Sequence, residues 1–206
     1  MKKAFPYIIG GVVLVLLVVL MMGSAGKPQR KFDERVTLRR GDKIPYGTRV
    51  AWELLPTMFT DARFIYDRKS STYWDSLDYS ESRQAVVVVA DYFDADRSEL
   101  DEMADFVKNG NYVFIVSRAA SDEVSSFFDV TFNSDYYPGY SVEDDDSLRV
   151  QLNPAIFPNT GVYSYPGKKY DGSFYKLDSL HTTVLGRDEK GHPNFVQLNQ
   201  GRGSFF

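Results

Sequence analysis

Residues that could act as nucleophiles, general bases or metal ligands are few in this chain of 206 residues. It contains no cysteine, which excludes a thiol nucleophile, a disulfide and a cysteine-based metal site. The only histidines are His181 and His192, and their separation matches no helical ligand pair. We therefore expect no metal and no cofactor. His181, which follows an aromatic run, has the chemistry of a general acid or base.

Ser117 is the other candidate nucleophile. It follows the apolar residues 112–116, and the sequence predicts a turn over residues 117–121 that leads into a helix. The flanking glycines of a G-x-S-x-G nucleophile elbow are missing. A turn or N-cap role for Ser117 or Ser121 is therefore favoured over a nucleophilic one.

Arg118 lies in the same predicted turn, and two roles are open to it. At a helix N-terminus, its charge and the neighbouring N–H groups would favour an anionic ligand. Alternatively, it forms a surface ion pair with Asp122 or Glu123, and this second role is favoured.

Two acidic patterns resemble cation sites. Asp94, Asp96 and Ser98 begin like a calcium loop, but Glu99 stands where that loop requires glycine. The same residues fit a capping box, with Asp96 as N-cap and Glu99 three positions later. The contiguous carboxylates of residues 143–146 are more typical of a solvated loop than of a metal site.

A glycine motif and a group of tyrosines complete the candidate sites. Gly201-Arg202-Gly203 lacks the third glycine of a dinucleotide site, so a tight turn before a strand is predicted. The tyrosines either stack on a sugar or peptide or fill the core of a β-rich lobe. They are Tyr136, Tyr137, Tyr140, Tyr163, Tyr165 and Tyr170.

An α/β core is predicted from the centre of the chain. Residues 85–90, AVVVVA, resemble a strand that is buried on both faces of a parallel sheet. A helix is predicted over residues 97–109 and a second strand over residues 112–117. This βαβ unit would bring Asp91, Tyr92, Ser117, Arg118 and Ala119 to one crevice at the carboxyl ends of its strands.

The flanking regions differ from this core. Before it, a helix is predicted from Thr48, with Val50, Leu54 and Met58 on one face and Pro56 kinking or ending it, and a short strand over residues 62–66. After residue 130, short strands and hairpins are predicted. They cover residues 148–152, 162–165, 173–177, 182–186 and 195–198, and a further strand begins near the last residue, which suggests a truncated copy of a longer protein.

The N-terminus predicts a membrane location. Residues 4–22 form an apolar run without charge, long enough for a helix across a bilayer. We favour an uncleaved transmembrane signal-anchor over residues 1–26, followed by a juxtamembrane linker over residues 27–41 and a domain over residues 42–206. A cleaved signal peptide ending at Gly23-Ser24-Ala25 is the alternative.

The distribution of charged residues gives evidence on the membrane orientation of the domain and on whether it binds nucleic acid. Basic residues of the linker outnumber Lys2 and Lys3, which by the positive-inside rule places the domain in the cytoplasm. A short N-terminal tail is hard to translocate, however, and we favour a domain outside the cytoplasm. With 24 basic and 28 acidic residues, the chain lacks the positive charge of a nucleic-acid-binding surface.

Three motifs resemble the bacterial domain-of-unknown-function 4350 family, over most of residues 32–206. They are the stretch Gly41-Asp42-Lys43-Ile44-Pro45-Tyr46-Gly47-Thr48, the pattern Glu99-Leu100 with Phe106-Val107 and Gly110 before residues 112–115, and Gly201-Arg202-Gly203. The resemblance implies an N-terminal anchor, a fold like class I glutamine amidotransferases (flavodoxin-like), and often a second transmembrane helix beyond residue 206. It also suggests other membrane proteins and an AAA+ ATPase as partners, and no established activity.

Two functions follow as hypotheses. Amidotransferases carry a cysteine on the turn after the strand that corresponds to residues 112–116, and this chain has none. We therefore expect a membrane-anchored, non-catalytic binding or assembly module, in contact with the lipid bilayer, that uses the crevice at Asp91, Tyr92, Ser117, Arg118 and Ala119. The alternative is a hydrolase that uses Ser117 or a histidine in the same crevice.

Overall fold

The computed structural model describes residues 35–206 except 45, 70–73, 75–76, 134–146 and 167–171. The chain divides into two compact units, Met1–Arg35 and Val36–Phe206, and the second unit is described below. The predicted anchor of residues 1–26 and most of the linker lie outside the described residues. Within the described part, no helix is both long and apolar enough to span a bilayer.

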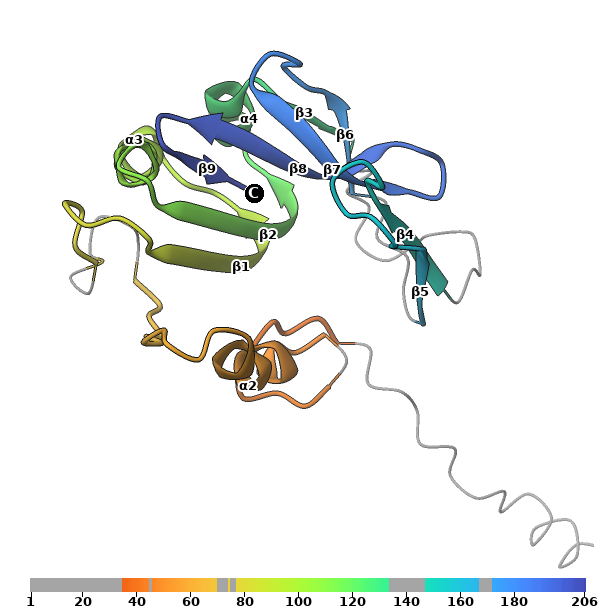
Figure 1. Cartoon of the computed structure of the whole chain (residues 1–206), viewed down its shortest axis with the longest axis horizontal. Coiled ribbons are helices and arrows are strands. Elements are labelled where there is room, and N and C mark those ends of the chain that lie inside the picture. The colour runs from red at the N-terminus through yellow and green to blue at the C-terminus, as the bar shows by residue number, and fades with distance from the viewer. Residues whose placement is uncertain (1–34, 45, 70–73, 75–76, 134–146, 167–171) are drawn as a thin grey trace, which may run out of the picture. The chain divides into compact units, whose positions relative to one another are not determined.

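The fold is a mixed α/β one, built on a sheet of seven strands in the order β1-β2-β9-β8-β7-β4-β5 (Figure 1). Strands β1, β2 and β9 run parallel, and each later neighbour along the sheet is antiparallel to the one before it. The strands are β1 Ala85–Phe93, β2 Tyr112–Ala120, β4 Ser147–Leu152, β5 Val162–Pro166, β7 Thr182–Asp188, β8 Pro193–Gln200 and β9 Gly203–Phe205. The predicted parallel sheet is therefore only the first part of a mixed sheet.

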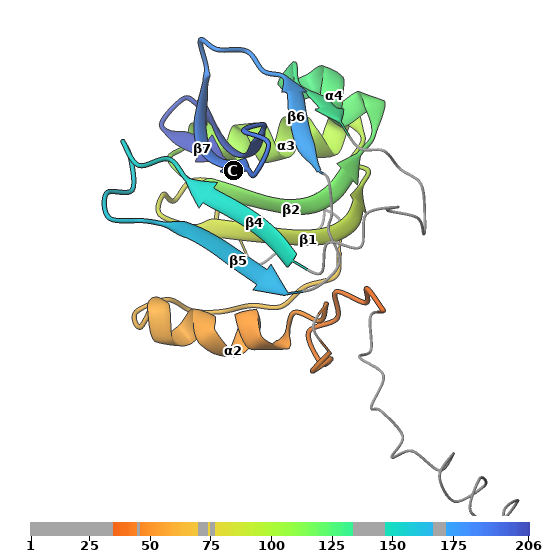
Figure 2. The same ribbon diagram turned by 90° about the vertical axis from the view of Figure 1, so that its right-hand side faces the viewer.

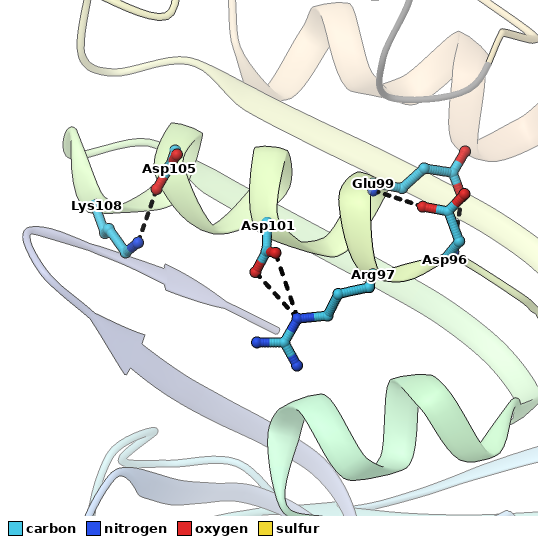
Figure 3. A network of polar contacts seen from close by, with 6 residues as sticks. All are labelled: Asp96, Arg97, Glu99, Asp101, Asp105 and Lys108. Atoms are coloured by element: carbon cyan, nitrogen blue, oxygen red, sulfur yellow. Dashed lines mark hydrogen bonds and ion pairs between the residues drawn. The ribbon is translucent and has the colours of Figure 1, made fainter.

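The predicted βαβ unit is confirmed. β1 pairs in parallel with β2 from Ala85 opposite Tyr112 onward, and helix α3, Arg97–Lys108, connects the two strands. The capping box begins this helix: the Asp96 carboxylate accepts a hydrogen bond from the Glu99 N–H at 2.9 Å, and the Glu99 side chain accepts one from the Asp96 N–H at 3.0 Å (Figure 3). The carboxylates are thus used as helix caps, as the sequence predicted.

The core lies on the face of the sheet that α3 covers, which we call the inner face (Figure 2). Leu100, Phe106 and Val107 of α3 are fully buried there, against Val113 of β2 and Phe205 of β9. Helix α4, Asp122–Phe128, begins at the N-cap Ser121 and adds Val124 and Phe128 to the same core. One helical layer therefore supplies the main apolar contacts of this sheet.

The prediction that residues 85–90 are buried on both faces is wrong. From Ala85 to Asp91 the side chains of β1 alternate between exposed and partly buried, and Val87 is 52% exposed and Val89 37% exposed. Val86 and Val88, which point to the inner face, pack on the core. A continuous β-branched run therefore formed a strand of the expected type, but α3 covers only one of its faces.

Asn111 joins four parts of the fold. Its side chain is fully buried, and its Oδ1 accepts a hydrogen bond from the Gln84 N–H at 2.9 Å, just before β1. Its Nδ2 donates to the carbonyls of Glu81 at 2.9 Å and Phe106, in the last turn of α3, at 3.1 Å. Its own carbonyl accepts from the Ser204 N–H of β9. A buried amide that is fully hydrogen-bonded in this way holds the starts of three parallel strands together.

The predicted tight turn at Gly201-Arg202-Gly203 is confirmed and explains both glycines. Gly201 has a φ of +60° and lies against the backbone of Lys108 at the end of α3. A Cβ at Gly203 would overlap the carbonyl oxygens of Val107 and Asn111. The turn between β8 and β9 therefore packs on the C-terminus of α3 at backbone distance, which only glycine permits.

The β-rich C-terminal part is also confirmed, and its strands extend the sheet or form a small second one. β7 and β8 form a hairpin whose turn is closed by Asp188, and β3, Thr131–Asn133, pairs with β6, Ser173–Lys176. The predicted strands at 148–152, 162–165, 173–177, 182–186 and 195–198 correspond to β4, β5, β6, β7 and β8.

The segment before β1 forms helix α2, Arg49–Met58, as predicted, with Pro56 inside it. Arg40 lies over the rings of Trp52 and Tyr66, at 4.9 and 4.2 Å from their centroids. The predicted strand at residues 62–66 is wrong, because these residues form no strand and their aromatic side chains contact Trp52 instead.

Replacing Asp96 with Ala should lower the free energy of unfolding by about 1 kcal/mol, because the first turn of α3 loses its side-chain acceptor. Urea denaturation followed by circular dichroism measures this loss. The matched control is Asp101→Ala, which removes only the exposed pair with Arg97 at 3.3 Å and should cost at most about 0.5 kcal/mol. Equal effects of the two changes would contradict the capping role.

Replacing Asn111 with Leu should lower the free energy of unfolding by roughly 2–4 kcal/mol, because three backbone groups lose their partner: the buried Phe106 carbonyl, and the partly buried Gln84 N–H and Glu81 carbonyl. Asn109→Ala, which removes one hydrogen bond from Nδ2 to the Tyr79 carbonyl, should cost about 1 kcal/mol. Urea denaturation of both variants gives the comparison. A loss at Asn111 no larger than that at Asn109 would refute its central role.

Candidate functional site

An ion pair marks the carboxyl ends of β1 and β2. Arg118 donates from Nε to Asp91 Oδ1 at 2.9 Å and from Nη2 to Asp91 Oδ2 at 2.8 Å, so the pair is bidentate. The Arg118 side chain is 25% exposed and that of Asp91 is 49% exposed. The guanidinium fork matches the carboxylate geometry, which makes this one of the stronger kinds of surface pair.

This pairing corrects the sequence-based interpretation of Arg118. The favoured partner was Asp122 or Glu123 in a turn that leads into a helix, whereas the structure pairs Arg118 with Asp91. The physical reason is that β2 continues through Ala120, so Arg118 is a strand residue beside β1. The role at a helix N-terminus is also wrong, since Ser121 is the N-cap of α4.

Ser117 likewise lies within β2 and not on a turn between strand and helix. Its Oγ donates to the Ala119 carbonyl at 2.6 Å and lies 3.5 Å from the Asp91 carbonyl. A turn or N-cap role for Ser117 is therefore wrong, while the N-cap role of Ser121 is confirmed by its hydrogen bond from the Val124 N–H at 3.4 Å. The hydroxyl proton of Ser117 is directed at the backbone.

The five predicted crevice residues are neighbours in the structure but do not share one face. Ala90 pairs with Ser117 and Tyr92 with Ala119, so strand alternation places Asp91 and Arg118 on the opposite face from these pairs. Ala119 is buried, and Tyr92 is 48% exposed. The ion pair thus belongs to the uncovered face, whereas Ser117 and Ala119 belong to the inner one.

Each histidine is hydrogen-bonded to a nearby aspartate. His181 Nδ1 lies 2.6 Å from Asp178 Oδ2, and His192 Nδ1 lies 3.3 Å from Asp188 Oδ2 in the turn between β7 and β8. Over the described residues, neither ring is hydrogen-bonded to Ser117. The structure therefore does not bring the predicted candidate base and nucleophile together in hydrogen-bonded contact.

The carboxyl group of Asp178 is electrostatically perturbed by this arrangement. The hydrogen bond with His181 lowers the pKa of Asp178, and the hydrogen bond from the Leu180 N–H lowers it further. Both interactions favour the charged carboxylate. The two hydrogen bonds hold the turn that leads into β7, so a local structural role is enough to explain why His181 lies next to Asp178.

The remaining candidates are partly outside the described residues. The carboxylates of residues 143–146 and Tyr136, Tyr137, Tyr140 and Tyr170 belong there. Tyr163 and Tyr165 are described, and both are exposed on β5, so they do not fill a core. Within the described ranges, no group of three or more metal-ligating side chains occurs.

The pairing of Asp91 with Arg118 is what the sequence interpretation missed, although a signal for it exists. Asp91 directly follows the six-residue run AVVVVA, and Arg118 directly follows YVFIVS, which is five apolar residues and a serine. In two parallel strands that start in register, equal offsets place the residues side by side. The pair is missed from the sequence because the predicted second strand ends at Ser117, one residue before Arg118.

Comparisons with known proteins add little to this geometry. No family model and no curated protein matches the sequence. Similar solved structures include Gan42B, a GH42 β-galactosidase from G. stearothermophilus, with 15% identity over 63% of this chain and 19% of that one, at a TM-score of 0.40. Its E323A catalytic mutant has 15% identity over 59% and 18%, at 0.38.

A third solved structure is the exo-β-1,4-mannosidase Op5Man5 from Opitutaceae bacterium strain TAV5. It has 12% identity over 58% of this chain and 19% of that one, at a TM-score of 0.34. The chain thus spans less than a fifth of the length of these enzymes. At TM-scores below 0.5, the likeness carries no argument about fold or activity.

Replacing His181 with Ala should raise the pKa of Asp178 toward its ordinary value, because the largest cause of its lowered pKa is removed. A carboxyl whose pKa is lowered by folding stabilises the fold above its unfolded pKa and loses this contribution as the pH falls through the folded pKa. Carbon-detected NMR titration of the Asp178 carboxyl measures the shift. His192→Ala is the control and should leave Asp178 unchanged; a shift of equal size there, or none in the first variant, would contradict the assignment.

Proposed function

We propose that this protein is a membrane-anchored, non-catalytic binding or assembly module on an amidotransferase-like α/β fold, of the kind found in the domain-of-unknown-function 4350 family. Residues 1–26 form the anchor, and the domain lies outside the cytoplasm. Binding takes place at the carboxyl ends of β1 and β2. The partner is another membrane protein, and an AAA+ ATPase system is one candidate.

The observation that carries this proposal is the ion pair between Asp91 and Arg118. Ligands of open α/β sheets bind at the carboxyl ends of parallel strands, which is where this pair lies. The pair is bidentate and partly exposed, and Tyr92, which is 48% exposed, follows Asp91 at the same strand end on the other face of β1. Arginine and tyrosine, together with tryptophan, are the residue types most enriched among the residues that dominate binding at protein interfaces.

A binding role also fits the chemistry of the neighbouring serine. Ser117 is hydrogen-bonded to a backbone carbonyl, and a serine nucleophile needs a general base as its hydrogen-bond partner. A partner with an acidic side chain can compete with Asp91 for the Arg118 guanidinium, since both groups reach the surface. Exchange of one carboxylate for another is then the recognition step.

A photo-crosslinking amino acid at position 92 of the full chain tests the proposal in membranes of the producing cell. We expect it to form an adduct with a defined membrane protein, and the same amino acid at the exposed position 175 on β6 not to. Arg118→Glu should reduce the adduct at position 92 about tenfold or more, because it removes the cation and repels acidic groups. Arg97→Glu, on the exposed side of α3, is the charge-matched control and should leave the adduct unchanged.

Two outcomes would overturn the proposal. Adducts of equal amount at positions 92 and 175 would show that the strand ends are not a specific surface. Labelling of Ser117 by a fluorophosphonate probe, lost in Ser117→Ala, would show an activated nucleophile and favour a hydrolase. Mass spectrometry of the mature N-terminus checks the anchor separately, since a start near Gly26 would mean a cleaved signal peptide.

A further inference from the structure

The uncovered face of β1 and β2 carries a continuous apolar surface, which we call the outer patch. Val87 is 52% exposed, Tyr112 42% and Val116 45%. The register places Val87 beside Phe114 and Val89 beside Val116, so these side chains point to the same face. The outer patch consists of Val87, Val89, Tyr112, Phe114, Val116 and Phe206.

Ring contacts and polar borders define this patch as a bounded surface. Phe114 stacks on Phe206 at 5.9 Å between ring centroids, and Phe206 also contacts Tyr112 at 6.2 Å. At the carboxyl ends of the strands, the patch stops at the ion pair of Asp91 and Arg118. Toward β8 the patch continues to Phe195, whose ring lies 5.7 Å from that of Phe114, and it then meets a hydrogen-bonded polar group formed by Gln197, Asn199 and Ser204. A contiguous apolar patch with a polar rim is typical of a surface that another element covers.

Helix α2 presents the complementary surface. Val50, Leu54 and Met58 recur at every fourth position along one side, and they are 65%, 52% and 69% exposed. The ion pair between Arg49 and Glu53, at 2.7 Å, lies about 100° around the helix from this stripe. A helix of ten residues is marginal in water unless its apolar side is packed. None of its residues is buried by the contacts that the structure describes.

We propose that α2 docks on the outer patch of its own chain and forms a second helical layer on the sheet. The apolar stripe from Val50 to Met58 rises about 12 Å along the helix. The outward side chains of β2 from Tyr112 to Val116 span about 13 Å. Both surfaces are uncharged and of similar length, and among the residues that the structure describes neither is covered by another element. A sheet with a helix on each face is the stable arrangement for parallel strands.

The covalent connection between α2 and β1, here called the tether, favours docking of the chain's own helix on the outer patch over docking of a helix from a second copy. Residues 59–84 join α2 to β1. Trp74, Leu77 and Tyr79 pack against the core, so the part of the tether that sets its reach is the stretch 59–73, which at about 3.3 Å per residue is long enough to reach the outer face. A helix on such a tether has an effective concentration near the millimolar range. Association with a second copy must compete with this value at ordinary protein concentrations. The proposal concerns a surface distinct from the strand-end site and does not rest on the proposed function.

The absence of cysteine makes disulfide trapping a clean test in the full chain, kept in solution by mild detergent. We compare the double variant Leu54→Cys with Val87→Cys against the control Glu53→Cys with Val87→Cys. Docking brings position 54 to the outer patch and turns position 53 away, so the first pair should give at least about tenfold more intrachain disulfide. Mass spectrometry of peptides from the non-reduced monomer identifies the bond.

Hydrogen exchange supplies a second measurement that does not depend on disulfide geometry. In the full chain, Val87→Glu should reduce the protection of α2 amides at least about tenfold, because it puts a charge into the docking surface. Amides of α3, on the inner face, should keep their protection and show that the domain is folded. Unchanged α2 protection with α3 intact would overturn the proposal, as would equal disulfide yields from the two cysteine pairs. A predominantly interchain disulfide would overturn the own-chain form in favour of a second copy.

Discussion

The buried amide of Asn111 is the constraint on which the rest of this fold depends. Its side chain, at the start of β2, is hydrogen-bonded to the segment just before β1 and to the last turn of α3. Its backbone carbonyl accepts a hydrogen bond from the Ser204 N–H of β9. The glycines of the turn before β9 complete the arrangement, since Gly203 must approach the same backbone without a side chain. Three parallel strands therefore begin from a single hydrogen-bonded junction, and their register follows from it. The positions of Asp91 and Arg118 at the far end of the strands are a consequence of this register.

One-sided packing is the second organising feature. α3 and α4 cover the inner face and bury Leu100, Phe106 and Phe205, while the outer face keeps valines and aromatic residues at the surface. Such a surface costs free energy in water, in proportion to its apolar area. Helix α2 likewise has an exposed apolar side, formed by Val50, Leu54 and Met58. The docking that we propose for α2 removes both apolar surfaces from water and leaves the ion pair at the edge of the helix.

At the candidate site, the continuation of β2 past Ser117 determines which groups Ser117 and Arg118 contact. A serine at the tip of a turn has an exposed hydroxyl, whereas Ser117 inside β2 is hydrogen-bonded to the Ala119 carbonyl. The same continuation brings Arg118 beside β1 and gives it Asp91 as a bidentate partner. Three residues of extra strand, Arg118 to Ala120, thus place a charged pair where the sequence predicted a turn.

Local patterns in the sequence determined the elements of this protein. The capping box at Asp96, the apolar runs before Asp91 and Arg118, and the turn at Gly201-Arg202-Gly203 each depend on residues a few positions apart, and each is confirmed. Only the tertiary structure decided which side of β1 is covered, because a run of valines has the same sequence pattern whether one face or both are packed. It also decided the partner of Arg118, since an ion pair across 27 residues depends on strand register and on where β2 ends. Hydrogen bonds within a turn are encoded locally, whereas burial and pairing between strands depend on what the rest of the chain places beside them.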